Sequence, residues 1–348
     1  MDSVTQIVLG AAVGEAVLGK KMGNKAVLAG GISGTIPDLD VLFGPFMSKV
    51  DGLAFHRGIS HSILFAVIGG LFFGWCAFRL FNKKRTQLSG YDSTRGSLKE
   101  WQLLFFLGMF THALLDSFTM YGTQLFAPFS DYRVAFNSIA VADFFYTVPF
   151  IFCLFMTIIS KKDTRRRSRW NYAGLTISSL YLVFTLANKA YVSNKFEQAL
   201  SEQNIYYTEK IIGPTILTNF LWNITADGGD VYYSSKYSWF DSSPIDFDVV
   251  EKNHELTANA SMDRTIGILK WFTKGFYNVI RLPDGNIQIN DLRYGTFDNP
   301  DMTQNYIFRF VLQKQKDGHF EMISSEGGPP KGEEQKMISN LWKRIKGV

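Results

Sequence analysis

Cysteine is almost absent from this sequence of 348 residues, which contains only Cys76 and Cys153. Both thiols lie in apolar segments, where cysteine acts as a small hydrophobic residue. Two cysteines so placed exclude a disulfide framework and a zinc site built from thiolates. The N-terminus also lacks a basic segment followed by a cleavage site, so we expect residues 1–18 to be retained as structure.

Charge is nearly absent from long stretches of the first half of the chain. Before about residue 192, uncharged runs alternate with basic clusters, whereas polar and apolar residues are mixed after it. The basic excess behind the net charge of +5 falls mainly in two loops, 83–99 and 161–169. Because neither loop interleaves aromatic residues with its charges, no nucleic-acid partner is expected. Anionic lipid headgroups suit such loops better.

Four apolar segments are long enough, or nearly so, to cross a bilayer, which takes roughly 20 residues. They are residues 62–78, 101–129, 134–160 and 170–188. Two shorter apolar stretches, 4–19 and 26–37, could form a helical hairpin packed against these spans or could cross with them. The sequence therefore predicts an α-helical membrane domain of four to six helices over residues 1–192.

The two basic loops also predict the orientation of this domain. Loops rich in lysine and arginine stay on the cytoplasmic side of a membrane. Two predicted spans separate the loops, so both loops can lie on that side together. The residues near 37, 56 and 121, and the whole chain after residue 192, are then expected to face outward.

Residues 193–348 predict a smaller, β-rich α+β soluble domain. Turn signals at Gly228-Gly229, Pro283-Asp284-Gly285 and Asp317-Gly318 each separate two segments rich in β-branched and aromatic residues, which is typical of hairpins. The expected strands are 216–224, 231–237, 276–282, 286–292, 306–313 and 319–323, and the expected helices are 262–272 and 333–345. No catalytic group of residues is recognisable there, and the sequence does not predict what this domain recognises.

Ionisable residues inside the apolar segments are the strongest functional signal, because a charge in a membrane is costly. His112 and Asp116 are four residues apart and so share one face of a helix; the alternative is a hydrogen bond that only ties helices together. Asp38 and Asp40 follow Pro37, which ends the preceding apolar run. Both carboxylates could face a site, or they could form a polar turn with a helix cap.

Three of the five histidines lie at positions 56, 61 and 112. His56 and His61 flank Gly58, and their five-residue spacing fits a turn better than one helix face. The alternative is that Ser60 or Ser62 caps a helix and the histidines are bystanders.

The three imidazoles and three carboxylates together match the ligands of zinc or another borderline divalent ion. The predicted metal ligands are Asp38, Asp40, His56, His61, His112 and Asp116. A bound ion would lower the pKa of a water molecule to about 7, and a carboxylate not fully used by the metal, Asp38, Asp40 or Asp116, could be the general base. Arg57 and Arg133 could hold an anionic substrate group such as phosphate, or they could lie at the membrane interface.

Several of these motifs occur in a specific order: Pro37-Asp38-Leu39-Asp40, the run 56–62, the run 111–116, the run 119–122 and Pro128. In this order they resemble the YdjM-type family of inner-membrane metal-dependent hydrolases, over about residues 1–160. The resemblance implies a place in a bacterial-type inner membrane, helices packed around metal ions and phosphoester hydrolysis. It also implies a remote similarity to zinc-dependent phospholipases C and single-strand nucleases.

The sequence departs from the family pattern at one position. Family members often have a histidine near the start of the first helix, and the matching residue here is Gln6, whose oxygen is a weaker ligand. Glu15 and Asp143 are further candidates, because each is a lone carboxylate in an apolar run and the family has an acidic residue near position 143. For both, a hydrogen bond to a neighbouring helix is the structural alternative.

The sequence as a whole favours a membrane-bound hydrolase that acts through a metal-activated water on a phosphoester, either a small molecule or a lipid. Two alternatives remain: a metal or proton transporter, and a non-catalytic binding or assembly protein. A transporter would need polar residues continuing toward the cytoplasmic ends of the spans. Segments 62–78 and 101–110 have almost none, which favours a site on one side of the membrane.

Overall fold

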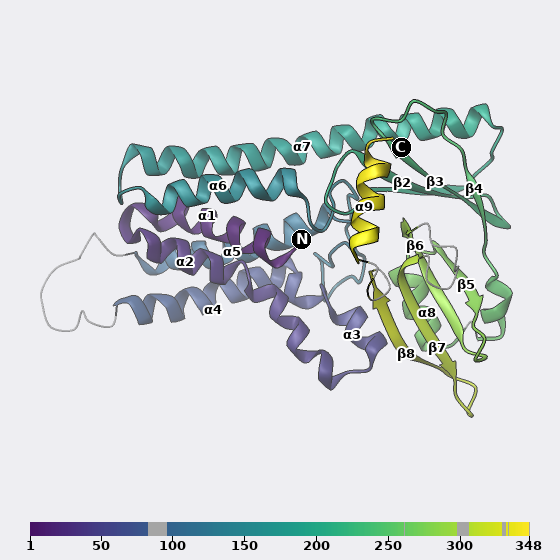
Figure 1. The fold of residues 1–348 in the computed structure, drawn as a ribbon. Helices are drawn as coiled ribbons and strands as arrows, with labels where there is room; N and C mark the ends of the chain where they lie inside the picture. The colour runs from purple at the N-terminus through teal and green to yellow at the C-terminus, as the bar shows by residue number, and fades with distance from the viewer. Residues whose placement is uncertain (83–95, 261, 298–305, 329–331, 333, 348) are drawn as a thin grey trace, which may run out of the picture. The chain divides into compact units, whose positions relative to one another are not determined.

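The computed structural model describes residues 1–82, 96–260, 262–297, 306–328, 332 and 334–347. Most of the first basic loop, 83–95, lies outside these residues. The chain forms two compact units (Figure 1). Unit 1 comprises residues 1–43 and 55–186, and unit 2 comprises residues 44–54 and 187–348.

Unit 1 is helical throughout its regular structure, as the sequence predicts. Its α-helices are α1 (Ser3–Met22), α2 (Asn24–Ser33), α4 (Ile63–Asn82), α5 (Leu98–Ser117), α6 (Phe144–Ile159) and the first part of α7 (Arg165–Glu202). Two 3₁₀ helices, η1 (Ile36–Phe46) and η2 (Ile59–His61), begin in the turns around them. A further short helix, α3 (Lys49–Phe55), lies almost wholly in unit 2.

The helices differ in extent from the predicted spans. Segment 101–129 is not one span, because α5 ends at Ser117 and an irregular segment follows it up to Asp143. Segment 134–160 is helical only from Phe144. Hydropathy could not reveal either boundary, because the irregular segment is as apolar as a helix. By length and composition, two helical segments among the described residues are candidate membrane spans, Asn24–Phe46 and Ile63–Phe81.

Unit 1 exposes apolar side chains along whole helix faces, which a protein surrounded by water rarely does. Large exposed residues on α4 recur three or four positions apart: Leu64, Val67, Ile68, Leu71, Phe72 and Trp75. A similar row follows α6: Phe144, Phe145, Val148, Ile151, Phe152, Phe155, Ile158 and Ile159. These rows are suited to contact with lipid.

Helices α1 and α2 approach each other through glycines. A Cβ atom at Gly30 would collide with the carbonyl oxygen of Gly10 and lie 2.8 Å from the Cα atom of Gly14. A Cβ atom at Gly10 would likewise lie 2.9 Å from the Cα atom of Gly34. Both helices therefore carry a small-xxx-small motif, which lets two backbones come into direct contact in a membrane. In the expected helical hairpin over residues 4–37, these glycines allow the backbones of α1 and α2 to lie in contact.

Besides α3 and the last part of α7, the described residues of unit 2 form two four-stranded antiparallel sheets and two helices, in agreement with the predicted α+β class. The first sheet has the order β1 (Glu209–Pro214), β2 (Leu221–Asp227), β3 (Val231–Ser238), β4 (Asp248–Glu251). The second has the order β5 (Tyr277–Arg281), β6 (Ile287–Thr296), β7 (Tyr306–Lys314), β8 (Phe320–Gly327). The helices are α8 (Arg264–Phe272) and α9 (Glu334–Ile345), and a 3₁₀ helix, η4 (His254–Ala260), precedes α8.

The three predicted hairpins are confirmed as β2–β3, β5–β6 and β7–β8. The sequence analysis missed β1 and β4, the two edges of the first sheet. This sheet packs on the last turns of α7, where Val192, Phe196 and Leu200 are fully buried.

We predict that Gly30→Ala lowers the stability of unit 1 by about 1–3 kcal/mol, because the added methyl group must push two backbones apart. Gly31→Ala is the matched control in the same helix, since its Cβ atom would meet Ile7 at an ordinary contact distance of 3.4 Å. Thermal unfolding of the purified chain in detergent measures both effects. Equal melting temperatures for the two variants would contradict the proposed glycine contact.

Candidate metal centre

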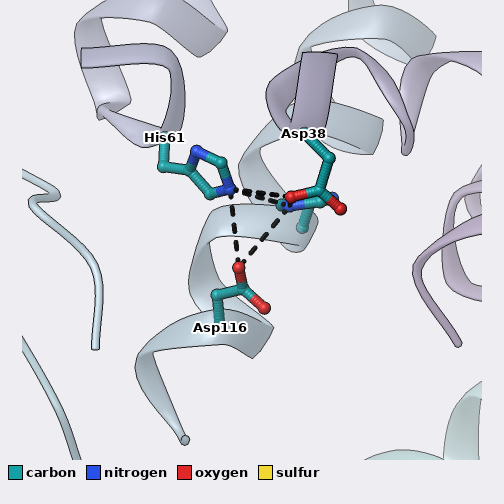
Figure 2. Close-up of side chains that lie close together, drawn as sticks. Asp38, His61 and Asp116 are labelled. Atoms are coloured by element: carbon teal, nitrogen blue, oxygen red, sulfur yellow. Dashed lines mark hydrogen bonds and ion pairs between the residues drawn. The ribbon is translucent and has the colours of Figure 1, made fainter. Parts of the chain in front are cut away.

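Four of the six predicted ligands converge at one end of unit 1. Asp38 comes from η1, directly after α2, and His61 ends η2 immediately before α4. His112 and Asp116 lie one turn apart on α5. Figure 2 shows the His61 imidazole and the carboxylates of Asp38 and Asp116 pointing toward a common point. One ligand atom from each of the four residues lies within 4.8 Å of all the others.

The distances between these ligand atoms are short and similar. The Nε2 atoms of His61 and His112 are 3.1 Å apart. Asp38 Oδ1 lies 3.3 Å from the first nitrogen and 3.4 Å from the second. Asp116 Oδ2 lies 3.5 and 3.6 Å from them. In a tetrahedral zinc site with bonds of about 2.0–2.1 Å, neighbouring ligand atoms are about 3.3 Å apart, so the spacing suits such an ion.

The tautomer of His112 is fixed by the backbone. Its Nδ1 atom lies 2.6 Å from the carbonyl oxygen of Gly34. A carbonyl oxygen can only accept a hydrogen bond, so Nδ1 must carry the hydrogen. The Nε2 atom of the neutral imidazole then presents a lone pair to the other ligands. Hydrogen bonding of the outer ring nitrogen in this way is usual for histidines that bind metal.

The tautomer of His61 is fixed by a short relay of side chains. Ser60 Oγ donates its one hydrogen to Asp40 Oδ2 at 2.9 Å. The same oxygen lies 2.9 Å from His61 Nδ1 and must therefore accept a hydrogen from it. The Nε2 atom of His61 is then also a lone-pair donor. With both imidazoles neutral, all four converging atoms are electron-pair donors, and they repel one another unless a proton or a metal ion lies among them.

The burial of the four side chains strengthens this conclusion. His61, His112 and Asp116 are at most 1% exposed, whereas the side chain of Asp38 is 21% exposed. Asp116 Oδ2 is buried and accepts no hydrogen bond from the described residues. This oxygen lies 3.0 Å from Arg57 Nε, and the other oxygen of Asp116 contacts the N-terminal ammonium group of Met1. The donor set, the spacing and this orphaned oxygen together fit a divalent cation.

Asp40 and His56 were also predicted as ligands, but the structure places them beside the four-residue group. Asp40 Oδ1 lies 3.0 Å from His56 Nδ1, and Asp40 Oδ2 accepts a hydrogen bond from the backbone N–H of Arg57. Both oxygens of Asp40 are thus used by protein donors. Asp40 orients His61 through the hydroxyl group of Ser60. It also orients His56 through a hydrogen bond with Nδ1 of that ring.

The two arginines proposed for substrate binding lie against one aromatic ring. The guanidinium carbons of Arg57 and Arg133 are each 4.8 Å from the centre of the Tyr121 ring. Arg57 also donates to Thr119 Oγ1 at 3.1 Å, and Arg133 donates to the carbonyl oxygen of His56 at 2.8 Å. Arg57 has a φ of +58°, a left-handed conformation that is uncommon for any residue except glycine.

The three additional candidates have other partners. Gln6 donates through Nε2 to Asp116 Oδ1 at 2.8 Å, so it faces this ligand with an atom that cannot bind a metal. Glu15 forms a buried bidentate ion pair with Arg167, at 2.6 and 2.7 Å. Asp143 caps α6 by accepting from the backbone N–H groups of Phe145 and Tyr146. Glu15 and Asp143 therefore have the structural roles considered as alternatives.

Some residues that shape the site could not be recognised from the sequence. The carbonyl group of Gly34 could not be identified, because a backbone acceptor leaves no mark in the sequence. Ser60 was considered only as a helix cap, and Thr119 and Tyr121 only as parts of a motif. Their proximity to His61 and Arg57 is a property of the tertiary structure.

The comparisons with known proteins agree with this helical unit. The family model described as YdjM inner membrane protein matches residues 1–192. No curated protein and no solved structure matches the chain.

We predict that the purified protein binds a divalent metal and that His112→Ala and Asp116→Asn each remove most of it, because each takes away one of four ligands. His56→Ala should retain the metal, and Asp40→Asn should weaken its affinity by about 10–100-fold by freeing His61. Elemental analysis after dialysis measures the content. His319→Ala is the control, since its side chain is 74% exposed in unit 2. Loss of metal from His56→Ala equal to that from His112→Ala would contradict the four-ligand assignment.

Proposed function

The chain belongs to the YdjM inner membrane protein family, and from this premise we propose that it is a membrane-bound, metal-dependent hydrolase of phosphoesters. The observation that carries the proposal is the convergence of four ligand atoms, which have no hydrogen between them when both imidazoles are neutral. In a contact with only a structural role we would expect a donor opposite each acceptor, and the neutral tautomers set by Gly34 and Ser60 provide none.

The residues that would hold the ion are Asp38, His61, His112 and Asp116. Two imidazole nitrogens and two carboxylate oxygens favour zinc among the common divalent ions, since calcium and magnesium prefer oxygen ligands alone. When bound, a divalent ion would act as a Lewis acid toward a water molecule and a phosphoryl oxygen. The protein's own contribution is to position the substrate and to move protons.

The substrate is expected to approach from the side of Asp38 and His56. These side chains are 21% and 28% exposed, whereas the other ligands are fully buried. Arg57 lies next to this group and pairs with Asp116 at 3.0 Å. If Asp116 is neutralised by a metal ion, the charge of Arg57 is left to attract an anion. A guanidinium group binds phosphate by paired hydrogen bonds, which favours a phosphoester over a neutral substrate.

Asp40 and His56 are the pair best placed for proton transfer. Asp38 and Asp116 contribute oxygens to the metal group, so Asp40 is the one predicted carboxylate outside it. Asp40 holds His56 by Nδ1, which leaves Nε2 on the partly exposed side of the ring. An oriented imidazole of this kind suits a general acid or base. In this proposal His56 acts on the proton, and Asp40 fixes its orientation.

We predict that the metal-loaded protein in lipid nanodiscs hydrolyses a phosphoester and that a chelator abolishes the activity, which zinc then restores. Asp38→Asn should lower kcat/KM by at least about 100-fold, since it removes a ligand. Arg57→Lys should mainly raise KM, because lysine cannot make the paired contact. A chromogenic panel of phosphomonoesters and phosphodiesters, followed by phospholipids, measures these changes. Tight metal binding without turnover on any of these substrates would instead favour a transporter or a non-catalytic binding protein.

The orientation of the chain is a second part of the proposal, with the metal centre and unit 2 on the outer face of a bacterial-type inner membrane. We predict that Asp230→Cys, introduced at an exposed turn of unit 2 after replacing Cys76 and Cys153, reacts with a membrane-impermeant maleimide on intact cells. Lys161→Cys in the second basic loop should react only after lysis. The opposite pattern would reverse the orientation.

A further inference from the structure

A second polar site lies at the other end of unit 1, where α1 ends and α7 begins. An open hollow with a volume of about 770 Å³ is lined there by residues of both helices and of the turn before α7. Its polar lining includes Lys20, Thr164, Arg165, Ser168 and Arg169. Figure 1 shows the first turns of α7 at the end of the helical unit that is remote from the N-terminus.

The cations of this hollow have no ionic partners in the part of the chain that the structure describes. Among the described residues, the side chains of Lys20, Arg165 and Arg169 are not part of any hydrogen bond or ion pair. Their sequence neighbours differ: Lys21 binds Glu100 at 2.7 Å, and Arg167 binds Glu15. Two basic residues near the hollow, Lys21 and Arg167, are thus neutralised by carboxylates, whereas the three that line it have no such partner among the described residues.

One carboxylate, Asp163, also lines the hollow, so its side chains carry a net charge of about +2. Unpaired cations gathered around an open volume attract an anion more strongly than scattered surface lysines do. The hydroxyl group of Ser168 adds a hydrogen-bond donor of the kind that phosphate oxygens accept, whereas the hydroxyl of Thr164 donates to the carbonyl oxygen of Lys161. The polar part of the site therefore matches an anionic phosphate group.

The remaining wall is apolar and continues along α7. Tyr172 and Ile177 line the hollow and are 56% and 46% exposed, and Leu180 is exposed one turn further on. From Arg169 to Leu180 the helix rises about 16 Å, close to half the thickness of the hydrocarbon core. The cations thus lie at headgroup depth, and the apolar stripe lies at the depth of acyl chains. A soluble anion has no apolar part that could contact this stripe, whereas a phospholipid has acyl chains.

The hollow is distinct from the metal centre. Gln6, which contacts Asp116, and Lys20 are both on α1, and 14 residues of helix separate them by about 21 Å. With the metal centre near one leaflet, the hollow faces the other. We propose that it is a binding site for an anionic phospholipid, whose phosphate is held by Lys20, Arg165 and Arg169. This site does not depend on the proposed hydrolysis.

The test is a lipid titration of the full-length protein followed by native mass spectrometry in detergent. The probes are phosphatidylglycerol and phosphatidylcholine. The site variant is Lys20→Gln with Arg165→Gln and Arg169→Gln. The matched control is Lys161→Gln with Lys162→Gln and Arg166→Gln, which removes three exposed charges from the same end of the unit but none from the hollow.

We expect the wild type to prefer phosphatidylglycerol and the site variant to lose at least about tenfold in affinity for it, since each basic residue contributes to the attraction. The control should change by less than about threefold, and millimolar inorganic phosphate should not displace the lipid. Equal losses in both variants would mean unspecific attraction to the basic end and overturn the proposal. Displacement by inorganic phosphate would overturn it in favour of a soluble anion. Unchanged helical circular dichroism shows that the site variant is folded.

Discussion

The mutual repulsion of four electron-pair donors is the constraint on which the interpretation of unit 1 depends. The Nε2 atoms of His61 and His112 face each other at 3.1 Å, and both tautomers are set by hydrogen bonds on the far sides of the rings. Asp116, like Glu15 with Arg167, has cationic partners in the protein, namely Arg57 and the N-terminal ammonium group of Met1. The two facing imidazole nitrogens, with Asp38 close to both, are what favour a bound cation.

The geometry of this group originates in helix packing some distance away. The glycine contact between α1 and α2 brings Gly34 within reach of α5, where its carbonyl group receives the hydrogen of His112. The same hairpin places Gln6 against Asp116. Small residues in the helical hairpin therefore set the orientation of metal ligands that lie elsewhere in the sequence. A change in the spacing of the two helices would be transmitted directly to His112.

The sequence was informative wherever a local rule decides the structure. The Asp-Gly turns at Asp284 and Asp317 identified two hairpins, because these turns need particular residues. The edge strands β1 and β4 were not predicted, since an edge strand needs little regular apolar patterning. Residues 118–129 were mistaken for helix because an irregular segment can be as apolar as a span.

The chemistry of the site was predictable from the cost of charge in an apolar segment, which drew attention to His112 and Asp116. The presence of a charge in an apolar segment could not distinguish residues of the four-residue group from residues that only orient them. Asp40 has the same chemistry as Asp38, and only the position of Ser60 assigns it to His61. Glu15 gave the weaker signal of a lone carboxylate in an apolar run, and its partner Arg167 lies 152 residues away, beyond any local pattern.

At Arg57, the stability of the fold and the proposed role of the side chain favour different residues. A left-handed conformation costs an L-residue other than glycine roughly 1–2 kcal/mol, and Arg57 adopts it with a φ of +58°. Glycine at this position would relax the chain and remove the guanidinium group beside Asp116 in the same step. Higher stability and the proposed function therefore have opposite requirements at this residue. Under the proposed function, the guanidinium group beside Asp116 is the reason for an arginine at a position whose backbone favours glycine.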